Sequence, residues 1–567
     1  MKKEFNEKLI KILMDVVAVM VIAFFAYSIT PKTLQNDTFY TIKIGEHLQN
    51  TVGSVTKYLP WNNGMDLQDP FSYHENLPYM YPHWLYDLLT YKIYSINGFH
   101  SVYIATCVLA VVLGLSIYFV NRKLNKNIVI SAIITIGSLF CLKDFIAARA
   151  QLVTFILFVF TIYGIERFIV TKKIRYALLL VTIPIIIANV HSAVWPFYFV
   201  FYLPYIAEYI VSVLATTNYG NMIKRITLRI KKNKIGQSQF NTELNEINKL
   251  QLEHERKVEE KLKGTYKLDV VKEKNTKWLI LIMFVCLFTG LLTPIKDMPY
   301  TYTIRTMQGN TMQVISEHLP LTLINNVNVV VILTIVLGIL IFTKTKIKVR
   351  EFFMLFGLIL LSFISQRQVS MLVLAGNFIL VRMICTLLEK AKNILKIKVE
   401  NIVYINLISI TLITVLINIM SIDYSLKKKN HVFIDESSYP VGAADYIVNN
   451  IIPDVGKENL RIYNDYNYGS YLLYRDIPVF IDSRCDLYTP EFNGEKNKDG
   501  EFEGRDIFSD FVDISGLACS YESKFEEYDI THLVLLTNSK LNSLISKDIN
   551  YNLLYEDDYF VVYKRGI

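Results

Sequence analysis

The sequence has 567 residues, of which 52% are hydrophobic, 13% are aromatic and 19% are charged. A soluble protein of this length would carry about 25% charged residues and would form about three or four domains. The hydrophobic residues lie in long blocks, which excludes a disordered chain and a small disulfide-rich secreted protein. The net charge of +8 does not indicate a nucleic-acid partner, because it sums charges that can lie on opposite sides of a membrane.

Blocks of about 20 apolar residues are long enough to cross a bilayer as helices. The sequence contains about eleven such blocks, which predicts an α-helical polytopic membrane domain over residues 1–421. The first block has no small-residue cleavage site after it and is expected to stay as a signal anchor. The predicted spans are 11–30, 99–120, 127–142, 150–170, 175–191, 193–214, 277–294, 327–343, 350–366, 369–388 and 401–421.

The loops between these blocks predict the orientation. Lys and Arg collect before the first span and after every second span that follows, as at residues 122–126 and 344–350. Short cytoplasmic loops carry this excess, so the N-terminus is expected in the cytoplasm and the C-terminus outside. The protein is then a multi-pass plasma-membrane protein, and the outer loops 31–98 and 295–326 face the same side as the chain after residue 421.

Residues 422–567 predict an extracytoplasmic α/β domain with an excess of acidic residues. Apolar, β-branched and aromatic runs indicate strands, and helical periodicity indicates two helices between them. No glycine-rich phosphate-binding motif is present. The predicted strands are Arg461–Asp465, Pro478–Ser483, His532–Thr537 and Tyr559–Lys564, and the predicted helices are Tyr521–Tyr528 and Lys540–Ser546.

The segment 215–276 differs from the membrane blocks because it is highly charged. Phe240, Leu244, Ile247 and Leu250 repeat in it at helical spacing. A solvated cytoplasmic helical hairpin is the simplest interpretation. A surface for a protein partner or for anionic lipid is the alternative.

The six cysteines match no metal-binding motif. Four of them fall in predicted spans, and Cys485 and Cys519 fall in the outer domain. These two can form a disulfide outside the cell or remain free thiols.

The densest group of polar residues lies in the outer loop 31–98. Asp37 directly follows the first span, in a loop rich in aromatic residues and histidine. A carboxylate at this position can accept a proton from an incoming hydroxyl or amine, or it can ligate a divalent cation. The alternative is an ordinary solvated loop acid.

Three runs in this loop resemble the first outer loop of bacterial GT-C membrane glycosyltransferases. In that superfamily an Asp immediately after the first span acts as catalytic base or metal ligand, which implies this role for Asp37. Further matches follow in chain order near the outer ends of later spans. The loop runs are Asp37–Tyr40 with Gly45, Asp69–Tyr73 and His83–Leu85, and the later matches are Ala148–Gln151, Asn189–His191, Leu292–Pro294 and Ser365–Arg367.

Two other runs resemble the catalytic subunit of oligosaccharyltransferase. Val314–Pro320 is similar to an external loop that carries a Glu and closes over the active site of that enzyme, which implies a site role for Glu317. Asn464–Tyr471 is similar to its acceptor-reading Trp-Trp-Asp-Tyr-Gly motif but lacks both tryptophans. The acceptor-binding residues that this resemblance implies are Asn464, Asp465, Tyr466 and Gly469.

The resemblance implies a sugar linked to polyprenyl phosphate as the donor. Its charged head group needs cations on the outer face, and the guanidinium of Arg pairs with phosphate in a fork geometry. The alternatives are Arg side chains that extend to the lipid interface and hydrogen-bonded interfacial histidines. The residues expected to bind the donor are Asp69, His83, Arg149, Gln151, His191, Arg305, His318 and Arg367.

The expected reaction is a direct displacement with inversion at the anomeric carbon. Asp37 orients or deprotonates the acceptor hydroxyl, and Arg367 or Arg305 stabilises the leaving lipid phosphate. If a metal takes part, Asp37 and Glu317 are the expected ligands of Mg²⁺ or Mn²⁺. The acceptor can be a glycan, a lipid or a protein.

Two other functions fit the sequence less well. A transporter or flippase of lipid-linked glycans usually has charged sites in the middle of the membrane. Here the acids cluster in outer loops. A polysaccharide polymerase or ligase of different fold would lack the Asp69–Tyr73 run beside an Asp at the end of the first span.

Overall fold

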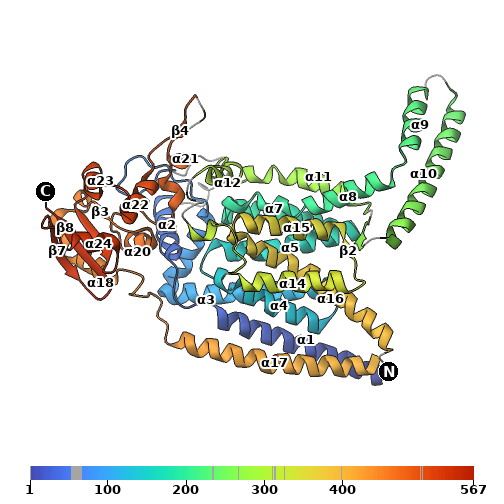
Figure 1. The fold of residues 1–567 in the computed structure, drawn as a ribbon, viewed down its shortest axis with the longest axis horizontal. Helices are drawn as coiled ribbons and strands as arrows, with labels where there is room; N and C mark the ends of the chain where they lie inside the picture. The colour runs from blue at the N-terminus through green and yellow to red at the C-terminus, as the bar shows by residue number, and fades with distance from the viewer. Residues whose placement is uncertain are drawn as a thin grey trace.

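The structure is a computed structural model, and one central bundle of long helices dominates it (Figure 1). It describes residues 2–52, 67–232, 235–265, 267–271, 273–309, 311, 315–324, 326–396, 399–498, 500 and 502–566. Parts of both predicted outer loops, at 53–66 and 312–314, therefore lie outside the described residues, and these include Val314 of the motif at Val314–Pro320.

Each predicted span coincides with a helix of this bundle. Seven helical segments of the described chain are long and apolar enough to cross a membrane, and α6, α11 and α14 are shorter apolar helices. The fold class of an α-helical polytopic membrane protein is confirmed. The helices are α1 (Lys2–Ile29), α3 (Trp84–Asn125), α4 (Ile128–Leu142), α5 (Ala150–Thr171), α6 (Ile174–Val190), α8 (Leu203–Thr216), α11 (Thr276–Cys286), α14 (Val327–Phe342), α15 (Val349–Ile364), α16 (Val369–Leu395) and α17 (Val399–Lys429).

Helix α3 is much longer than a bilayer requires, and a kink divides it. Asn97 and Gly98 leave the helical conformation, and Gly98 has φ of 59°, which glycine adopts without the steric cost of a side chain. The kink falls just before the predicted span at 99–120. The segment on the N-terminal side of the kink therefore belongs to the outer loop.

Helix α2 (Asn36–Val52) forms the described start of that loop and lies against this outer part of α3. The approach is close because Gly45 has no side chain. A Cβ atom at Gly45 would lie 2.2 Å from the carbonyl oxygen of Asp87. Gly45, which the sequence motif includes, thus sets the distance between these two helices.

The C-terminal domain contains a four-stranded sheet with the order β3-β6-β8-β7. Strand β3 is parallel to β6, and the other pairs are antiparallel. The predicted α/β domain is confirmed, although β7 was not predicted. Its elements are β3 (Ile462–Tyr463), β6 (His532–Leu536), β7 (Tyr551–Glu556) and β8 (Phe560–Arg565), with α18 (Val441–Tyr446), α19 (Ile452–Val455), α20 (Tyr466–Tyr474), α21 (Pro490–Asn493), α22 (Ile507–Gly516), α23 (Tyr521–Glu527) and α24 (Lys540–Ile545).

The strand predicted at Pro478–Ser483 is wrong. Only Val479 makes a bridge, to Ser72 of the outer loop. The side chain of Asn464 binds the next two backbone groups instead: Phe480 donates its N–H to Asn464, and Asn464 donates to the carbonyl of Ile481. The segment is apolar because it is buried beneath the outer loop and α20, not because it belongs to the sheet.

The outer loop and the C-terminal domain share one hydrophobic core. The ring of Phe39 in α2 lies 4.9 Å from that of Tyr439 and 5.1 Å from that of Tyr471, between centroids. The domain lies at one end of the bundle, and the N-terminus lies at the other (Figure 1). The described part of the loop 31–98 and the C-terminal domain therefore form one folded unit.

A helical hairpin projects from the end of the bundle that also carries the N-terminus (Figure 1). It consists of α9 (Tyr219–Ile230) and α10 (Gln237–Thr265). The segment predicted as a helical hairpin has this form, and its cytoplasmic location stays a prediction.

Charged residues near the same end of the bundle form a buried network. Arg350 contacts Glu208 at 3.0 Å and Glu166 at 3.3 Å, and Arg382 pairs with Glu351. Beside them, the short strands β1 (Leu268–Asp269) and β2 (Ile347–Lys348) pair in parallel. Burying paired charges in this way leaves no isolated charge in an apolar setting.

Candidate active site

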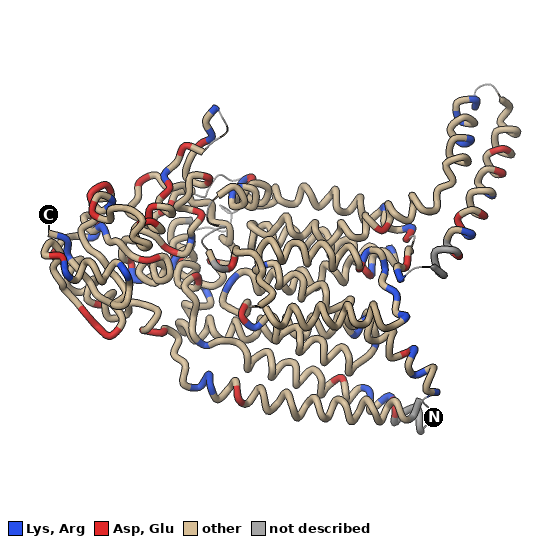
Figure 2. The backbone as a smooth tube through the Cα atoms, in the orientation of Figure 1, with Lys and Arg blue, Asp and Glu red and all other residues tan. Residues whose placement is uncertain are grey.

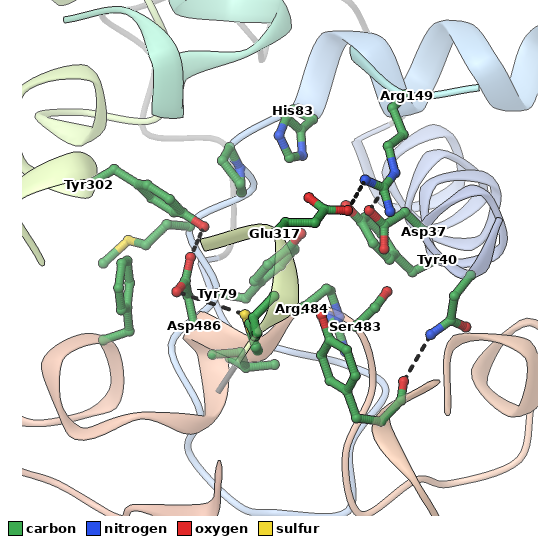
Figure 3. Close-up of a pocket in the computed structure, with 18 of the residues that line it drawn as sticks. Asp37, Tyr40, Tyr79, His83, Arg149, Tyr302, Glu317, Ser483, Arg484 and Asp486 are labelled. Atoms are coloured by element: carbon green, nitrogen blue, oxygen red, sulfur yellow. Dashed lines mark hydrogen bonds and ion pairs between the residues drawn. The ribbon is translucent and has the colours of Figure 1, made fainter. Parts of the chain in front are cut away.

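A polar cavity of about 290 Å³ lies between the outer loop, the start of α5, the loop at 315–318 and the C-terminal domain (Figure 3). Segments far apart in the sequence therefore line one space. Its lining includes Asn36, Asp37, Tyr40, Tyr79, His83, Arg149, Tyr302, Glu317, His318, Arg367, Tyr466, Asn467, Ser483, Arg484, Cys485 and Asp486.

Asp37 lies in the first turn of α2, where the positive end of the helix dipole favours a carboxylate. Its neighbour Asn36 donates a hydrogen bond of 2.8 Å to the carbonyl of Tyr466, which ties this helix end to the C-terminal domain. Arg149 precedes α5 in an extended conformation, and its Nε lies 2.9 Å from Oδ2 of Asp37. The helix start and the arginine thus fix the position of the Asp37 carboxylate.

Arg149 also donates to Glu317, with 3.1 Å between Nη1 and Oε1, so one guanidinium bridges both acids (Figure 3). Burial by itself would raise the pKa of Glu317, but Arg149 and Arg367 outweigh it and hold that pKa below its ordinary value. Burial would likewise lower the pKa of Arg149, yet Asp37 and Glu317 raise it. Glu317 is therefore ionised and Arg149 is charged at neutral pH.

Two histidines on the lining are neutral. Burial, and then the charges of Arg367 and Arg149, lower the pKa of His83 to about 3. Burial and Arg367 lower the pKa of His318 to about 4. Neutral imidazoles can accept or donate one hydrogen bond but add no positive charge. The positive charge near the two acids thus comes from arginine.

Arg367 lies at the junction of two cavities. No carboxylate forms an ion pair with its guanidinium among the residues that the structure describes. This differs from Arg149, which already holds two carboxylates. Arg367 is therefore the guanidinium of the site that remains able to pair with an incoming anion.

The second cavity, of about 390 Å³, shares Arg149, Glu317 and Arg367 with the first and also reaches Gln151. A third cavity, of about 310 Å³, shares Cys141, Asn328, Val329, Ile332 and Val373 with the second. The third lies among α4, α14, α15 and α16, and apolar side chains line most of it. The polar site thus adjoins an apolar space within the helical bundle.

Four of the predicted donor-binding residues line the polar cavity, and four do not. His83, Arg149, His318 and Arg367 line it, whereas Gln151 lines only the second cavity. Asp69 is buried behind the wall, where it pairs with Arg484 at 2.5 Å. His191 bonds to Thr154, and its ring lies 4.8 Å from that of His83 between centroids. Arg305 donates to the carbonyl of Glu491 at 3.5 Å.

Among the predicted acceptor-binding residues, only Tyr466 lines the cavity. Asn464 is buried and holds the segment after Val479, as described above. Asp465 caps α20 by accepting from the N–H of Asn467 at 2.8 Å. Gly469 lies against the backbone, where a Cβ atom would be 2.0 Å from the carbonyl oxygen of Ile481. These three residues position α20 rather than face the cavity.

Several lining residues were not predicted. Tyr302 of α12 (Met298–Gln308) donates a hydrogen bond to Asp486, whose pKa is raised by burial. Ser483 and Arg484 belong to the run that follows Pro478, where the density of polar residues after an apolar stretch was an available signal. Tyr302 had no such signal, because it is one of many aromatic residues in the loop 295–326.

The predicted metal ligands do not form a cation site here. Asp37 and Glu317 share one cavity, but the guanidinium of Arg149 contacts both carboxylates. Within the described ranges, no group of three or more His, Cys, Asp or Glu residues is arranged to hold a metal ion. This donor set does not fit Mg²⁺ or Mn²⁺, which need several oxygen ligands around one point.

Among known proteins, solved structures resemble this chain, and they resemble it in fold. No protein-family model and no curated protein sequence matches the chain. A structure of archaeal oligosaccharyltransferase AglB from Archaeoglobus fulgidus, in complex with an inhibitory peptide and a dolichol-phosphate, is 11% identical with a TM-score of 0.52. It is matched over 96% of this chain and 74% of that one.

A second structure of the Archaeoglobus fulgidus oligosaccharyltransferase, tethered with an acceptor peptide containing the NVT sequon, is also 11% identical, with a TM-score of 0.50. It is matched over 97% of this chain and 74% of that one. At this identity the likeness concerns the fold rather than the activity. The chain has the GT-C fold that its sequence motifs predicted.

Proposed function

We propose that the protein is a membrane glycosyltransferase that moves a sugar from a polyprenyl-phosphate-linked donor to an acceptor on the outer face of the membrane. One observation carries the proposal: a polar cavity with Asp37, Glu317 and Arg367 adjoins an apolar space within the membrane bundle. The GT-C neighbours supply the precedent, since their structures contain a dolichol-phosphate and an acceptor peptide.

The series of cavities matches the chemistry of a lipid-linked sugar. The apolar cavity among α4, α14, α15 and α16 suits part of the lipid tail, since burying hydrocarbon there avoids contact with water. Arg367 then meets the phosphate, and the sugar lies in the polar cavity. Of the two arginines predicted to stabilise the leaving phosphate, the geometry favours Arg367 over Arg305, which lies outside the lining.

In the proposed reaction, Asp37 accepts the proton of the acceptor hydroxyl. The acceptor oxygen forms a bond with the anomeric carbon while the bond from that carbon to the phosphate oxygen breaks. Polyprenyl phosphate leaves with the electron pair, and Arg367 stabilises its growing charge. Arg149 positions Asp37 and Glu317, and Tyr466 and Asn467 lie where an acceptor would enter from the C-terminal domain.

The proposed orientation places the site outside the cell. Residues 1–421 form the membrane domain with a cytoplasmic N-terminus, and residues 422–567 form the extracytoplasmic domain. The N-terminus and the hairpin lie at the end of the bundle opposite the C-terminal domain (Figure 1). Lys and Arg are frequent at the hairpin end (Figure 2), which agrees with a cytoplasmic location of that end.

Replacing Asp37 with Asn tests the proposal. Asn keeps the size of the side chain but cannot accept a proton as a base, so we expect release of polyprenyl phosphate to fall by about 100-fold or more, the usual contribution of a general base. The measurement uses the full-length protein in nanodiscs with radiolabelled polyprenyl-phosphate sugars. The donor is still expected to bind, because the substitution leaves Arg367, the proposed partner of its phosphate, unchanged.

The matched control is Asp297→Asn, which makes the same change at an exposed acid before α12, outside the cavity lining. This variant is expected to release polyprenyl phosphate as the parent does. Unchanged release in Asp37→Asn would refute the assigned role of Asp37. Movement of intact lipid-linked sugar across the bilayer, without release, would favour the flippase alternative.

A further inference from the structure

Helix α9 presents an apolar stripe that no other part of the described chain covers. Its members recur at intervals of three and four residues, so they lie on one face of the helix. Each is between 48% and 76% exposed. The stripe consists of Tyr219, Met222, Ile223, Ile226 and Ile230.

The opposite face of α9 is already occupied. Asn221 and Leu228, seven residues apart, are its buried residues, and they lie about half a turn from the centre of the stripe. α9 contacts α10 within the hairpin, and Phe240 of α10 is also buried. The contact between α9 and α10 in the hairpin therefore leaves the stripe uncovered.

The stripe has a strongly basic border. Residues 219–232 contain five Lys or Arg residues and no acidic residue. An apolar stripe flanked by long cationic side chains is typical of helices that lie in the plane of a membrane interface. A groove for an ordinary protein partner needs no such one-signed border. The five basic residues are Lys224, Arg225, Arg229, Lys231 and Lys232. Arg225 donates to Asn248 of α10 and Lys232 lies over the ring of Phe240, so Lys224, Arg229 and Lys231 are the ones assigned to the lipid.

The position of α9 in the fold also suits a helix that lies at the membrane interface. The membrane helix α8 ends at Thr216, three residues before α9 begins. In Figure 1 the hairpin runs across the direction of the bundle helices, and α9 lies on the bundle side of α10 near its tip. Because α10 packs on the face of α9 opposite the stripe, the stripe faces the bundle side. A bilayer around the bundle would present its head-group surface on that side.

We propose that α9 is an interfacial helix that binds the anionic lipid surface at this end of the bundle. The apolar stripe enters the boundary between head groups and acyl chains, and the basic residues contact the anionic head groups. The hairpin is thereby held flat on the bilayer beside the helical bundle. This inference does not depend on the proposed glycosyl transfer.

Depth-dependent fluorescence quenching tests the proposal on the full-length protein. A fluorophore on Ile226→Cys reports the stripe, and one on Thr242→Cys reports an exposed position of α10. The protein is placed in nanodiscs of phosphatidylcholine, with or without phosphatidylglycerol, that carry a nitroxide-labelled lipid. The parent protein, which has six free cysteines in the structure, gives the background.

With phosphatidylglycerol present, the label at residue 226 is expected to shift to shorter wavelength and to be quenched, while the label at residue 242 is not. Replacing Lys224, Arg229 and Lys231 together with Gln should remove most of this quenching. A label at residue 226 that stays in water in both nanodiscs overturns the proposal and points to a protein partner. Quenching of the label at residue 226 that is the same with and without phosphatidylglycerol, and the same in the Gln variant, also overturns the proposal.

Discussion

Arg149 and Arg367 extend guanidinium groups toward the same cavity in different electrostatic settings. Arg149 is held between Asp37 and Glu317, so its charge is already balanced by two carboxylates. Arg367 has no ion-pair partner among the described residues and borders both polar cavities. The two residues should therefore act on different steps, with Arg149 placing the acids and Arg367 binding the anionic donor.

Replacing Arg367 with Gln is expected to raise the KM for the donor by about 10- to 100-fold, because a hydrogen bond to a charged group contributes roughly 1.5–3 kcal/mol. Arg149→Gln should instead lower kcat with a smaller effect on KM, since it releases the two acids. Steady-state kinetics with a lipid-linked sugar measure both. A rise in KM for Arg305→Gln, with none for Arg367→Gln, would assign the phosphate to Arg305.

His74 joins the outer loop to the C-terminal domain, and its titration should affect stability. The buried ring bonds to the carbonyl of Phe480 at 2.9 Å, and burial lowers its pKa to about 4. The unfolded chain takes up a proton near pH 6.5, whereas the folded chain does so only near pH 4. The contribution of His74 is therefore complete above about pH 6.5 and is lost as the pH falls toward 4.

The Tm of the full-length protein in detergent should accordingly fall between pH 6.5 and pH 4. His83 and His318 act in the same direction, so the informative quantity is the difference between variants. His74→Gln, which retains a donor for Phe480, is expected to show a shallower decline than the parent. Equal slopes would mean that His74 does not contribute to the acid sensitivity.

At the scale of elements, the membrane helices were predictable from the sequence, whereas α2 in the outer loop and the direction of side chains were not. Spans of about 20 apolar residues and the recurring basic loops identify helices without tertiary information. Asp69, Asn464 and Gly469 belong to matching motifs but hold the wall of the cavity from behind. A motif gives the order of residues along the chain, whereas packing decides which of them face the space.

The misassigned strand at Pro478–Ser483 has a related cause. The apolar residues of this segment indicate that it is buried. Burial alone does not distinguish a strand from an extended segment whose backbone is hydrogen-bonded by a side chain. Asn464, sixteen residues earlier than Phe480, supplies that side chain. Such a long-range contact leaves no periodic signal, so local patterns predict the sheet better than the segments that support the site.

For the whole molecule, the main consequence of the fold is that the site is assembled only when the outer loop and the C-terminal domain meet. Asp37 and His83 come from the loop, whereas Tyr466 and Asp486 come from the domain. The shared core described above joins the two parts. The acidic excess of the domain and the basic loops of the membrane region then belong to opposite ends of one molecule.

A chain that ends at Lys429 should therefore lose the fold of its outer loop while it keeps its membrane helices. Lys43 of α2 reports this, because it is mostly buried and its Nζ lies 2.7 Å from Oδ2 of Asp476 in the C-terminal domain. In nanodiscs, trypsin is expected to cut after Lys43 rapidly in the shortened chain and slowly in the full-length protein, as followed by mass spectrometry. Cleavage after Lys126, an exposed residue at the C-terminal end of α3, serves as the reference for access of the protease. Equal protection of Lys43 in both chains would show that the loop folds without the domain. The hydrogen bond from Asn36 to the carbonyl of Tyr466 would then join two parts that fold independently, and the domain would not be needed to form the loop side of the cavity.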